Sequence, residues 1–491
     1  MSDSARPPSF ENTFARDLPD MFEPWSAVVV ERPTVLVVND SVARELGFDP
    51  SWLRGDEGTR FLVGNLELPG MHTVAQGYAG HQFGGFSPRL GDGRALLLGE
   101  VIDTNGVRRD VHLKGSGRTR YSRGGDGKAA VGPMLREYVI GEAMNALGIP
   151  TTRALGVVAT NELIPRDEML PGAVLCRVAL SHLRVGSFQY AATMSNDHVR
   201  RLADHAIARH DPELVDTEDR YLAFFHRVMN RQASLIANWM SVGFIHGVMN
   251  TDNMTISGET IDYGPCAFMD TYSPTTVFSS IDHQGRYAYG NQPHIAQWNL
   301  ARLAETLLPL IHDDKDESIR IATEAINGFP ALFEREWERR MRAKLGLTEQ
   351  SPVEANLFHS LLTLFESHRI DHTNGMRALS DVVRGRRERM HALFDMPLAF
   401  DTWARPWLDA LNLDPRDSND IADAMDAVNP AYVPRNHIVE TALAAASAGD
   451  LAPLDSLMEV LLHPFHERAG LEDYARPMPS DWEGYQTFCG T

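Results

Sequence analysis

Residues 246–253, HGVMNTDN, and the Asp262-Tyr263-Gly264 motif carry the side chains with the clearest chemistry in this sequence. Asn253 and Asp262 offer an amide and a carboxylate oxygen, and such ligands suit a hard divalent cation that phosphates and water also bind. Asp252, directly before Asn253, is a carboxylate that can accept a proton. The pattern predicts a metal-assisted reaction at a nucleotide phosphate.

The spacing matches part of the catalytic loop of kinases, in which a catalytic Asp lies two residues after a His and a metal-binding Asn lies seven residues after it. Asn253 lies seven residues after His246, whereas the position of the catalytic Asp holds Val248. Valine cannot act as a base, so Asp252 is the candidate in its place. An Asp-Tyr-Gly motif alone is a common turn, but its order after His246 and Asn253 favours a nucleotide and metal site.

Two short strands are predicted between these motifs, at residues 254–256 and 260–261, with a turn at Ser257-Gly258. A strand pair at this place would match the hairpin that carries the metal-binding residues of a kinase. A polar, Gly-rich stretch over about residues 262–297 follows.

Lys114 and Glu137 form a second candidate pair. Lys114 ends the alternating segment predicted as a strand over residues 109–113, and Glu137 lies in a helix predicted over residues 133–147. Kinases carry their phosphate-binding Lys on such a strand and the Glu that orients it on the next helix. The alternative is that both are solvated surface charges, as most Lys and Glu side chains are.

Glycines and cations around Lys114 indicate an anion pocket. Gly91-Asp92-Gly93-Arg94 precedes a predicted strand, and glycines let backbone N–H groups approach phosphate oxygens. Residues 116–128 form a second Gly-rich stretch, and its basic residues are Arg118, Arg120, Arg123 and Lys128. Such a density of positive charge in an acidic chain favours phosphate binding.

Arg177 interrupts the apolar strand predicted over residues 173–180. Burying a cation without a partner is costly. Arg177 therefore either pairs with a carboxylate or faces a phosphate site, and Arg184, a few residues later, belongs to the same interpretation.

The elements that must position these residues change character along the chain. Strands are predicted first, at residues 95–102, 109–113, 154–159 and 173–180, with 25–30 and 34–38 as strands or a lead-in before them. Helices dominate after residue 181, at residues 219–242, 299–311, 317–344 and 440–448. This order predicts an α+β protein with a small β-rich lobe and a larger helical lobe.

Composition narrows the function. The 491 residues carry 46 Lys and Arg against 66 Asp and Glu, a net charge of −20, which disfavours binding to nucleic acid or to anionic membranes. Three cysteines are too few for a disulfide framework. Neither an N-terminal targeting signal nor an apolar run long enough to span a bilayer is evident, so a cytoplasmic protein is expected.

Long stretches of the sequence resemble the selenoprotein O family. They are HGVMNTDNM, IDYGPCAFMD, DHQGRYAYGNQP, YAGHQFGGFSPRLGDGRALLLGE and LKGSGRTRYSRGGDGKAAVGPMLREYVIGEAM. The resemblance covers about residues 71–311, with a weaker match at Cys489. It implies a protein-kinase-like two-lobed fold that binds ATP in a flipped orientation. It also implies transfer of AMP, and in some cases UMP, to Ser, Thr or Tyr hydroxyls of proteins.

The resemblance also assigns residue roles. Asp252 would be the proton acceptor, Asn253 and Asp262 would hold Mg²⁺ or Mn²⁺, and Glu137 would pair with Lys114. The residues expected to line the nucleotide site are Gly91, Gly93, Arg94, Lys114, Asp126, Gly127, Arg177, Arg184 and Asp262. The partners implied are ATP and protein substrates, redox-related proteins among them, for a chain expected to be a monomer.

The resemblance and the motifs together divide the chain into four parts. Residues 1–70 would be a lead-in packed on the lobes, 71–185 the nucleotide-binding lobe, 186–397 the lobe with the catalytic loop and metal site, and 398–491 a helical extension that ends near Cys489.

The charges fit attack at the α-phosphorus. This reaction expels pyrophosphate, a highly charged leaving group, and Lys114, Arg177 and Arg184 offer the cations that it requires. Two other functions stay open: a conventional kinase, which Val248 argues against, and a non-catalytic ATP-binding module, which the complete set of predicted metal ligands argues against.

Two further features carry weaker hypotheses. Some relatives pair a cysteine near the Asp-Tyr-Gly motif with a C-terminal cysteine or selenocysteine, and Cys266 with Cys489 is the pair that this chain offers. A packed Cys266 and an idle Cys489 are the favoured alternative. His368 and His372, four residues apart in a predicted helix, lack a third zinc ligand at a recognisable spacing and are interpreted as a polar helix face.

Overall fold

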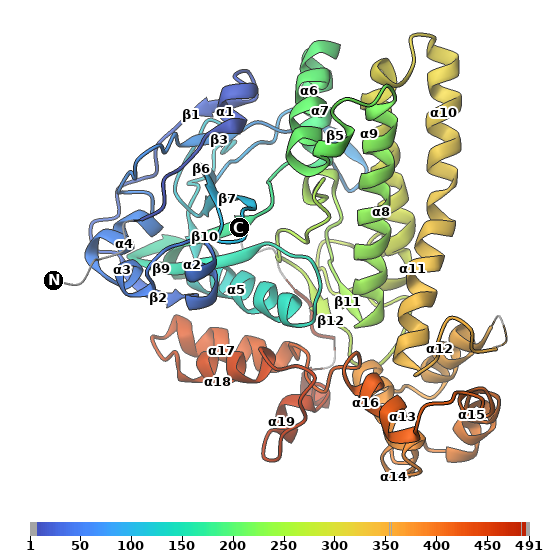
Figure 1. The fold of residues 1–491 in the computed structure, drawn as a ribbon. Helices are drawn as coiled ribbons and strands as arrows, with labels where there is room; N and C mark the ends of the chain where they lie inside the picture. Colours follow the sequence, from blue (N-terminus) through green and yellow to red (C-terminus); the bar gives the residue numbers. More distant parts are fainter. Residues whose placement is uncertain (1–6, 353, 355, 483, 488–491) are drawn as a thin grey trace.

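A computed structural model describes residues 7–487 apart from 353, 355 and 483, and its main feature is an eight-stranded antiparallel sheet (Figure 1). The strand order is β1-β3-β6-β7-β10-β9-β2, with β8 paired to β10. The strands are β1 (Phe22–Pro24), β2 (Thr34–Val38), β3 (Val74–Gln76), β6 (Ala95–Ile102), β7 (Arg108–Lys114), β8 (Ala129–Ala130), β9 (Arg153–Pro165) and β10 (Met169–Ala179). The four strands predicted between residues 95 and 180 are confirmed.

Both faces of the sheet are covered, so its strands are apolar on both sides. In β10, Val174 and Cys176 pack toward one face, whereas Ala173 and Leu175 pack toward the other, as the two-residue period of a strand requires. The helices on the first face are α2 (Asp40–Glu45), α3 (Pro50–Arg54) and α4 (Asp56–Leu62). Those on the second face are α5 (Val131–Ala146), α17 (Asn436–Ser447) and α18 (Ala452–Leu461).

The first 70 residues contribute to this sheet directly, through β1 and β2. Residues 25–30, one of the two segments predicted as strands there, form no strand. Two of its valines, Val28 and Val29, are exposed, and the backbone N–H of Val28 donates to Ser116 O at 2.9 Å, which holds the segment as a connection across the sheet. The division of the chain into four parts stays a prediction.

Helices dominate the second half of the chain, and α8 to α11 run as long neighbours beside the sheet (Figure 1). These and the preceding helices are α6 (Val185–Met194), α7 (Asn196–His210), α8 (Arg220–Ser241), α9 (Gln292–Ile311), α10 (Lys315–Asn327) and α11 (Phe329–Lys344). The helices beyond them are α12 (Leu357–Ser367), α13 (His372–Val383), α14 (Glu388–His391), α15 (Pro397–Leu411), α16 (Ser418–Asp426) and α19 (Glu472–Ala475), and near the N-terminus lies α1 (Thr13–Asp17).

The bounds of two predicted helices in this half of the chain need correction. The single helix expected over residues 317–344 is two helices that meet at Gly328, because Pro330 in the first turn of α11 has no N–H and cannot continue α10. Helix α9 begins at Gln292, earlier than the predicted start at residue 299, and Pro293 marks its first turn. Within the part of the chain that the structure describes, no helix is long and apolar enough to cross a membrane.

The catalytic-loop candidates are framed by a strand pair other than the predicted one. Residues 254–256 and 260–261 do not pair with each other, which corrects the expected hairpin. Their backbone groups bond to earlier segments: Ile256 N donates to Leu183 O at 2.9 Å, and Thr152 N donates to Thr260 O at 3.0 Å. The strands that pair are β11 (Phe244–Ile245) and β12 (Ala267–Phe268), which bring the two ends of the loop together.

Candidate functional site

A cavity of about 1150 Å³ lies between the sheet, the loop that β11 and β12 frame, and the C-terminal segment. It brings together most of the residues selected from the sequence. The selected residues on its wall are Gly91, Gly93, Arg94, Lys114, Asp126, Gly127, Glu137, Arg177, Asp252, Asn253 and Asp262.

A buried ion cluster forms one wall. Lys114 contacts Glu137 and donates to Oδ1 of Asp262 at 2.5 Å. Arg177 donates to the same Oδ1 at 2.7 Å, and its guanidinium lies 3.8 Å from Glu137. On the antiparallel strands β7 and β10, His112 lies opposite Arg177 and Leu175 opposite Lys114, so Lys114 and Arg177 project from the same face. Of the two alternatives for Arg177, a carboxylate partner is therefore present, and that carboxylate itself lines the cavity.

Asp262 is held ionised in an unusual backbone conformation. Burial raises the pKa of its carboxyl, but the charges of Lys114, Arg177 and Arg184 outweigh this effect and hold the pKa well below its usual range. Its φ is +63°, a left-handed conformation that Asp tolerates better than most residues. Because both cations bind Oδ1, Oδ2 remains available for a metal ion.

Asp252 lies in the opposite electrostatic environment. Its side chain is buried, and Oδ2 accepts a hydrogen bond from Gln82 Nε2 at 3.3 Å, whereas buried Oδ1 has no hydrogen-bond partner among the described residues. Burial raises the pKa of Asp252 to about 6. A Cβ on Gly80 would lie 2.6 Å from Oδ1, so only glycine permits this approach of the backbone.

Asn253 is oriented as a metal ligand would be. Its Nδ2 donates to Val248 O at 3.0 Å, which leaves its amide oxygen for a cation. The fit to Mg²⁺ or Mn²⁺ rests on this oxygen and Oδ2 of Asp262, because such ions are often bound by one or two protein oxygens together with phosphates. Groups of three or more His, Cys, Asp or Glu side chains that could hold a metal by themselves are absent from the described residues.

His246 stabilises the loop between β11 and β12 through hydrogen bonds at both ring nitrogens. Its Nε2–H donates to Ile261 O at 2.9 Å, and its Nδ1 accepts from Val248 N–H at 3.4 Å. The ring is fully buried, and burial lowers its pKa, so it is a neutral imidazole with both nitrogens engaged. It is therefore placed to support the loop and not to accept a proton from a substrate.

The basic stretch after Lys114 is partly structural. Arg118 donates to Gly124 O and Gly125 O, and Lys128 pairs with Glu162. Two cations on the cavity wall, Arg94 and Arg123, form no ion pair with any residue that the structure describes. They are thus the cations most available to phosphate oxygens.

Two predicted nucleotide-binding residues are engaged elsewhere. Asp126 lines the cavity, but its carboxylate binds Arg166 at 2.8 Å. Arg184 is buried behind the wall, with its guanidinium 4.3 Å from the ring centre of Tyr78, which does line the cavity. Its Nε and Nη2 have no hydrogen-bond partner among the described residues.

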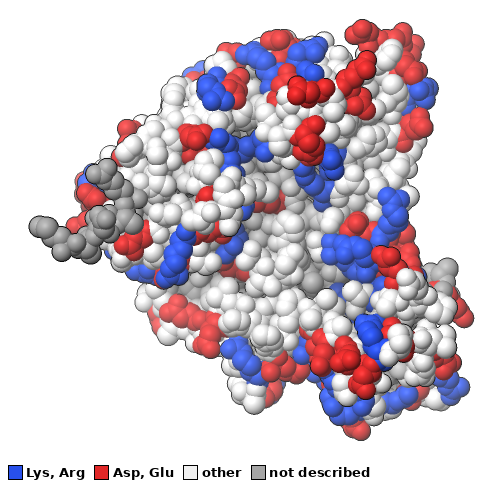
Figure 2. Space-filling view, in the orientation of Figure 1, with Lys and Arg blue, Asp and Glu red and all other residues white. Residues whose placement is uncertain are grey.

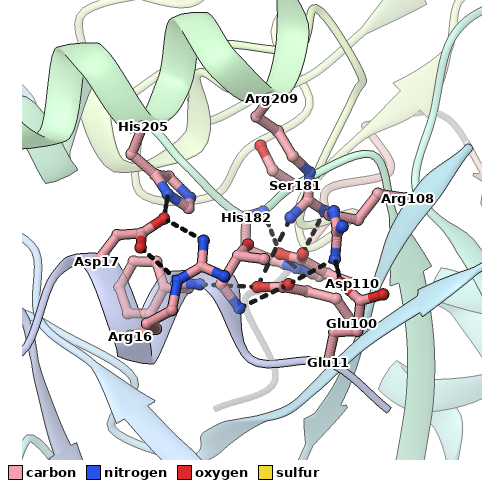
Figure 3. A network of polar contacts seen from close by, with 12 residues as sticks. Glu11, Arg16, Asp17, Glu100, Arg108, Asp110, Ser181, His182, His205 and Arg209 are labelled. Carbon is pink, nitrogen blue, oxygen red and sulfur yellow. Dashed lines mark hydrogen bonds and ion pairs between the residues drawn. The ribbon is translucent and has the colours of Figure 1, made fainter. Parts of the chain in front are cut away.

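Behind Arg177, a buried polar network extends to α7. Arg177 Nε donates to His112 Nδ1 at 3.3 Å, and His112 stacks on His182 at 4.1 Å. Asp110 accepts from the His182 backbone at 2.8 Å and from Arg209 at 2.6 Å (Figure 3). This network fixes β7, and therefore Lys114, against α7.

The C-terminal segment closes one side of the cavity, which the sequence did not indicate beyond a possible role of Cys489. Tyr485 donates to Glu440 at 2.6 Å, and Thr487 Oγ1 donates to Pro265 O at 2.7 Å. Cys266 is buried and forms no disulfide with any described cysteine, and burial raises the pKa of its thiol to about 11. Cys489 lies outside the described residues, so its pairing stays a hypothesis.

Other residues on the wall were also missed: Tyr78, Gln82 and Tyr121. All three lie in segments that the sequence analysis selected, but neither a tyrosine nor a glutamine there matches a residue type that those motifs assign to phosphate or metal binding. His368 and His372 do not share a helix, which corrects that prediction: α12 ends at Ser367, and buried His372 is the first residue of α13.

The cations at the cavity are a local feature. Figure 2 shows acidic and basic side chains interspersed over the face that it draws, with a band of mostly uncharged residues between its two halves. The positive charge at the cavity therefore stands out locally in a chain of net charge −20, and Figure 2 shows no wide basic surface on the face that it draws.

Known proteins match this chain over nearly its whole length. A family model described as protein adenylyltransferase SelO matches residues 7–462. A protein nucleotidyltransferase YdiU of Mycobacterium sp. (strain KMS) is 58% identical over 485 residues, 98% of this chain and 99% of that protein. Proteins of the same name from Mycolicibacterium paratuberculosis and Cereibacter sphaeroides (strain KD131) are 57% and 54% identical, each over 98% of this chain and 98% and 99% of their own lengths.

Proposed function

This chain belongs to the protein adenylyltransferase SelO family and is a protein nucleotidyltransferase, and we propose that it transfers AMP from ATP to Ser, Thr or Tyr hydroxyls of protein substrates. The observation that carries the proposal is the arrangement of two carboxylates in one cavity. Asp262 is held ionised beside Lys114 and Arg177, while buried Asp252, with its raised pKa, lines the same cavity.

The cavity residues support each part of an in-line displacement. The acceptor oxygen forms a bond to the α-phosphorus, the bond from that phosphorus to the β-phosphate oxygen breaks, and pyrophosphate leaves. Asp252 accepts the hydroxyl proton as the new bond forms. Arg94, Arg123, Lys114 and Arg177 stabilise the negative charge that develops on the phosphates.

Asn253 and Asp262 are the residues that would hold Mg²⁺ or Mn²⁺, which supplies positive charge to the phosphate oxygens. A sheet on one side of the cavity and the long helices on the other support the proposal of a kinase-like arrangement in two lobes. Val248 at the position of a kinase's catalytic Asp favours transfer of AMP over transfer of the γ-phosphate.

Mass spectrometry of acceptor proteins tests the proposal. The full chain is incubated with ATP, Mg²⁺ or Mn²⁺, and a dialysed protein extract, and pyrophosphate release is measured in parallel. We expect peptides that carry an adenylyl group on Ser, Thr or Tyr, with release of one pyrophosphate for each group attached. Phosphorylated peptides with release of ADP would support a kinase, and unmodified peptides would support a binding module. UTP in place of ATP tests for UMP transfer.

A further inference from the structure

An aromatic hairpin, residues 80–87, stands beside the catalytic loop without contributing a charge to the phosphate site. It consists of β4 (Gly80–Gln82) and β5 (Gly85–Ser87), and Figure 1 shows β5 close to α6 and α9. Phe83 and Phe86 are 38% and 47% exposed. Two exposed phenylalanines on one short hairpin offer apolar surface that a bound segment could cover.

Three hydrogen bonds join the hairpin to the loop that carries Asp252. His81 N–H donates to Thr251 Oγ1 at 2.7 Å, and Phe83 N–H donates to the side-chain oxygen of Asn250 at 3.1 Å. Gln82 donates to Asp252 itself. A protein hydroxyl that approaches Asp252 must therefore bring its flanking residues alongside the hairpin. Phe83 lines the cavity, as does Ile281, which is 50% exposed.

Arg286, beside the hairpin, would favour a bound segment that carries negative charge. Arg286 stacks on Trp298 of α9 at 4.8 Å and on Tyr287 at 5.7 Å. A Cβ on Gly84 would lie 3.8 Å from the Arg286 Cζ, so the guanidinium lies directly next to the turn of the hairpin. Arg286 forms no ion pair with any described residue, whereas neighbouring Arg302 pairs with Glu305 at 2.6 Å. In a chain of net charge −20, such an arginine complements an acidic partner.

The backbone of the hairpin offers a third element of recognition. Within the described residues β5 pairs with β4 alone, so its outer edge is not paired with another strand. An extended peptide can add to an open strand edge through main-chain hydrogen bonds, while neighbouring pockets select its side chains.

We propose that the aromatic hairpin and Arg286 bind the segment of a protein substrate that flanks the acceptor hydroxyl, and that this segment is extended and carries an apolar and an acidic side chain. The inference rests on the proposed function and names the class of acceptor sequence that the same site takes. Phe83 and Phe86 contact the apolar side chain, and Arg286 binds the carboxylate.

Peptide libraries test this proposal. The full chain is incubated with ATP labelled at the α-phosphate and with octapeptides that carry one Ser, in which each flanking position holds Glu, Lys, Phe or Ala. We expect the wild-type protein to favour Glu over Lys near the acceptor by about tenfold in kcat/KM. Phe86→Ala should raise KM for the favoured peptide by about tenfold. Arg286→Glu should reverse the preference to Lys, and Arg286→Lys should retain it.

Matched surface variants separate docking from general damage. Leu413→Ala and Arg335→Glu change an exposed leucine and an exposed arginine away from the cavity, and should leave the peptide KM unchanged. The dissociation constant for ATP should stay within about twofold for every variant. The proposal is overturned if the wild-type protein shows no preference for Glu over Lys. It is also overturned if Phe86→Ala and Arg286→Glu have the peptide KM and the Glu preference of the wild-type protein, or if the wild-type protein labels extract proteins but no peptide. Label on neither proteins nor peptides contradicts the proposed function as well.

Discussion

Asp252 and Asp262 are carboxylates from one loop whose environments shift their pKa values in opposite directions. Burial raises the pKa of Asp252 to about 6, whereas Lys114 and Arg177 outweigh the burial of Asp262 and hold its pKa well below its usual range. Such a divergence commonly separates a group that exchanges protons from one that stays charged. It supports Asp252 as the base and Asp262 as the metal ligand.

Replacing the proposed base should separate chemistry from binding. Asp252→Asn keeps the size of the side chain but cannot take up a proton, so kcat should fall by roughly 10²–10⁴-fold. ATP affinity should change little, because a base acts in the transition state. Single-turnover rates and equilibrium binding of ATP measure the two effects. Asp313→Asn, an exposed carboxylate away from the cavity, is the control, and near-wild-type kcat for Asp252→Asn would remove the base assignment.

The sequence predicted much of the site because its motifs have a fixed order and spacing. Lys114, Glu137 and Asp262 come from three separate segments, and the structure brings them into one ion cluster. Gln82 and Thr487 could not be predicted, since their contacts with the site span 170 and 222 residues and follow no local pattern. The functional roles of all these residues stay predictions.

Among the elements, α17 and α18 connect the end of the chain to the site. They pack on α5, the helix that carries Glu137, in one cluster that includes Leu135, Leu443 and Leu457. Arg136 on the same helix pairs with Glu440 of α17 at 2.8 Å. The C-terminal helices thus stabilise the position of α5 relative to the sheet.

Two leucines, one on α18 and one directly after it, test this packing. Leu457 is 1% exposed, and Leu457→Ala should lower the free energy of unfolding by about 2–5 kcal/mol through the lost contacts and the cavity left behind. Leu462, just after the helix, is 44% exposed, so Leu462→Ala should change the free energy of unfolding by less than about 0.5 kcal/mol. Urea unfolding followed by fluorescence compares the two. Equal effects would show that α18 does not pack as described.

Elements with a clear period were predicted well, and those fixed by distant partners were not. Strands β6 and β7 follow alternating or apolar runs, and α8 follows a strong helical period. The prediction of a hairpin over residues 254–261 was wrong because Thr255 forms a β-bridge to Arg184 and Thr260 forms a β-bridge to Thr151. Such long-range competition is not visible in a local pattern.

For the whole molecule, buried ionisable groups make stability depend on pH. Glu259 is 5% exposed, accepts hydrogen bonds from Leu180 N–H at 2.8 Å and Ser257 at 2.9 Å, and has its pKa raised by burial from 4.5 to about 7. As pH rises, the unfolded chain loses this proton first, near pH 4.5, while the folded protein keeps it until about pH 7. Glu259 therefore makes folding less favourable as pH rises across that window.

Glu259→Gln should reveal this contribution. The variant cannot ionise, so its free energy of unfolding relative to wild type should increase by up to about 3 kcal/mol between pH 4.5 and pH 7. Thermal unfolding at a series of pH values measures the difference, and Glu354→Gln at an exposed position is the control. A difference that is constant across this range would contradict the raised pKa.

The most direct test of AMP transfer at this cavity compares ATP labelled at the α-phosphate with ATP labelled at the γ-phosphate. The wild-type chain and Asp262→Asn are each incubated with an extract and saturating Mg²⁺ or Mn²⁺, and the label retained on protein is counted. The wild-type chain should leave label on protein from the α-position only. Asp262→Asn should leave none, because the carboxylate between Lys114 and Arg177 loses its charge. Label retained from the γ-position, or wild-type labelling by Asp262→Asn, would contradict this account.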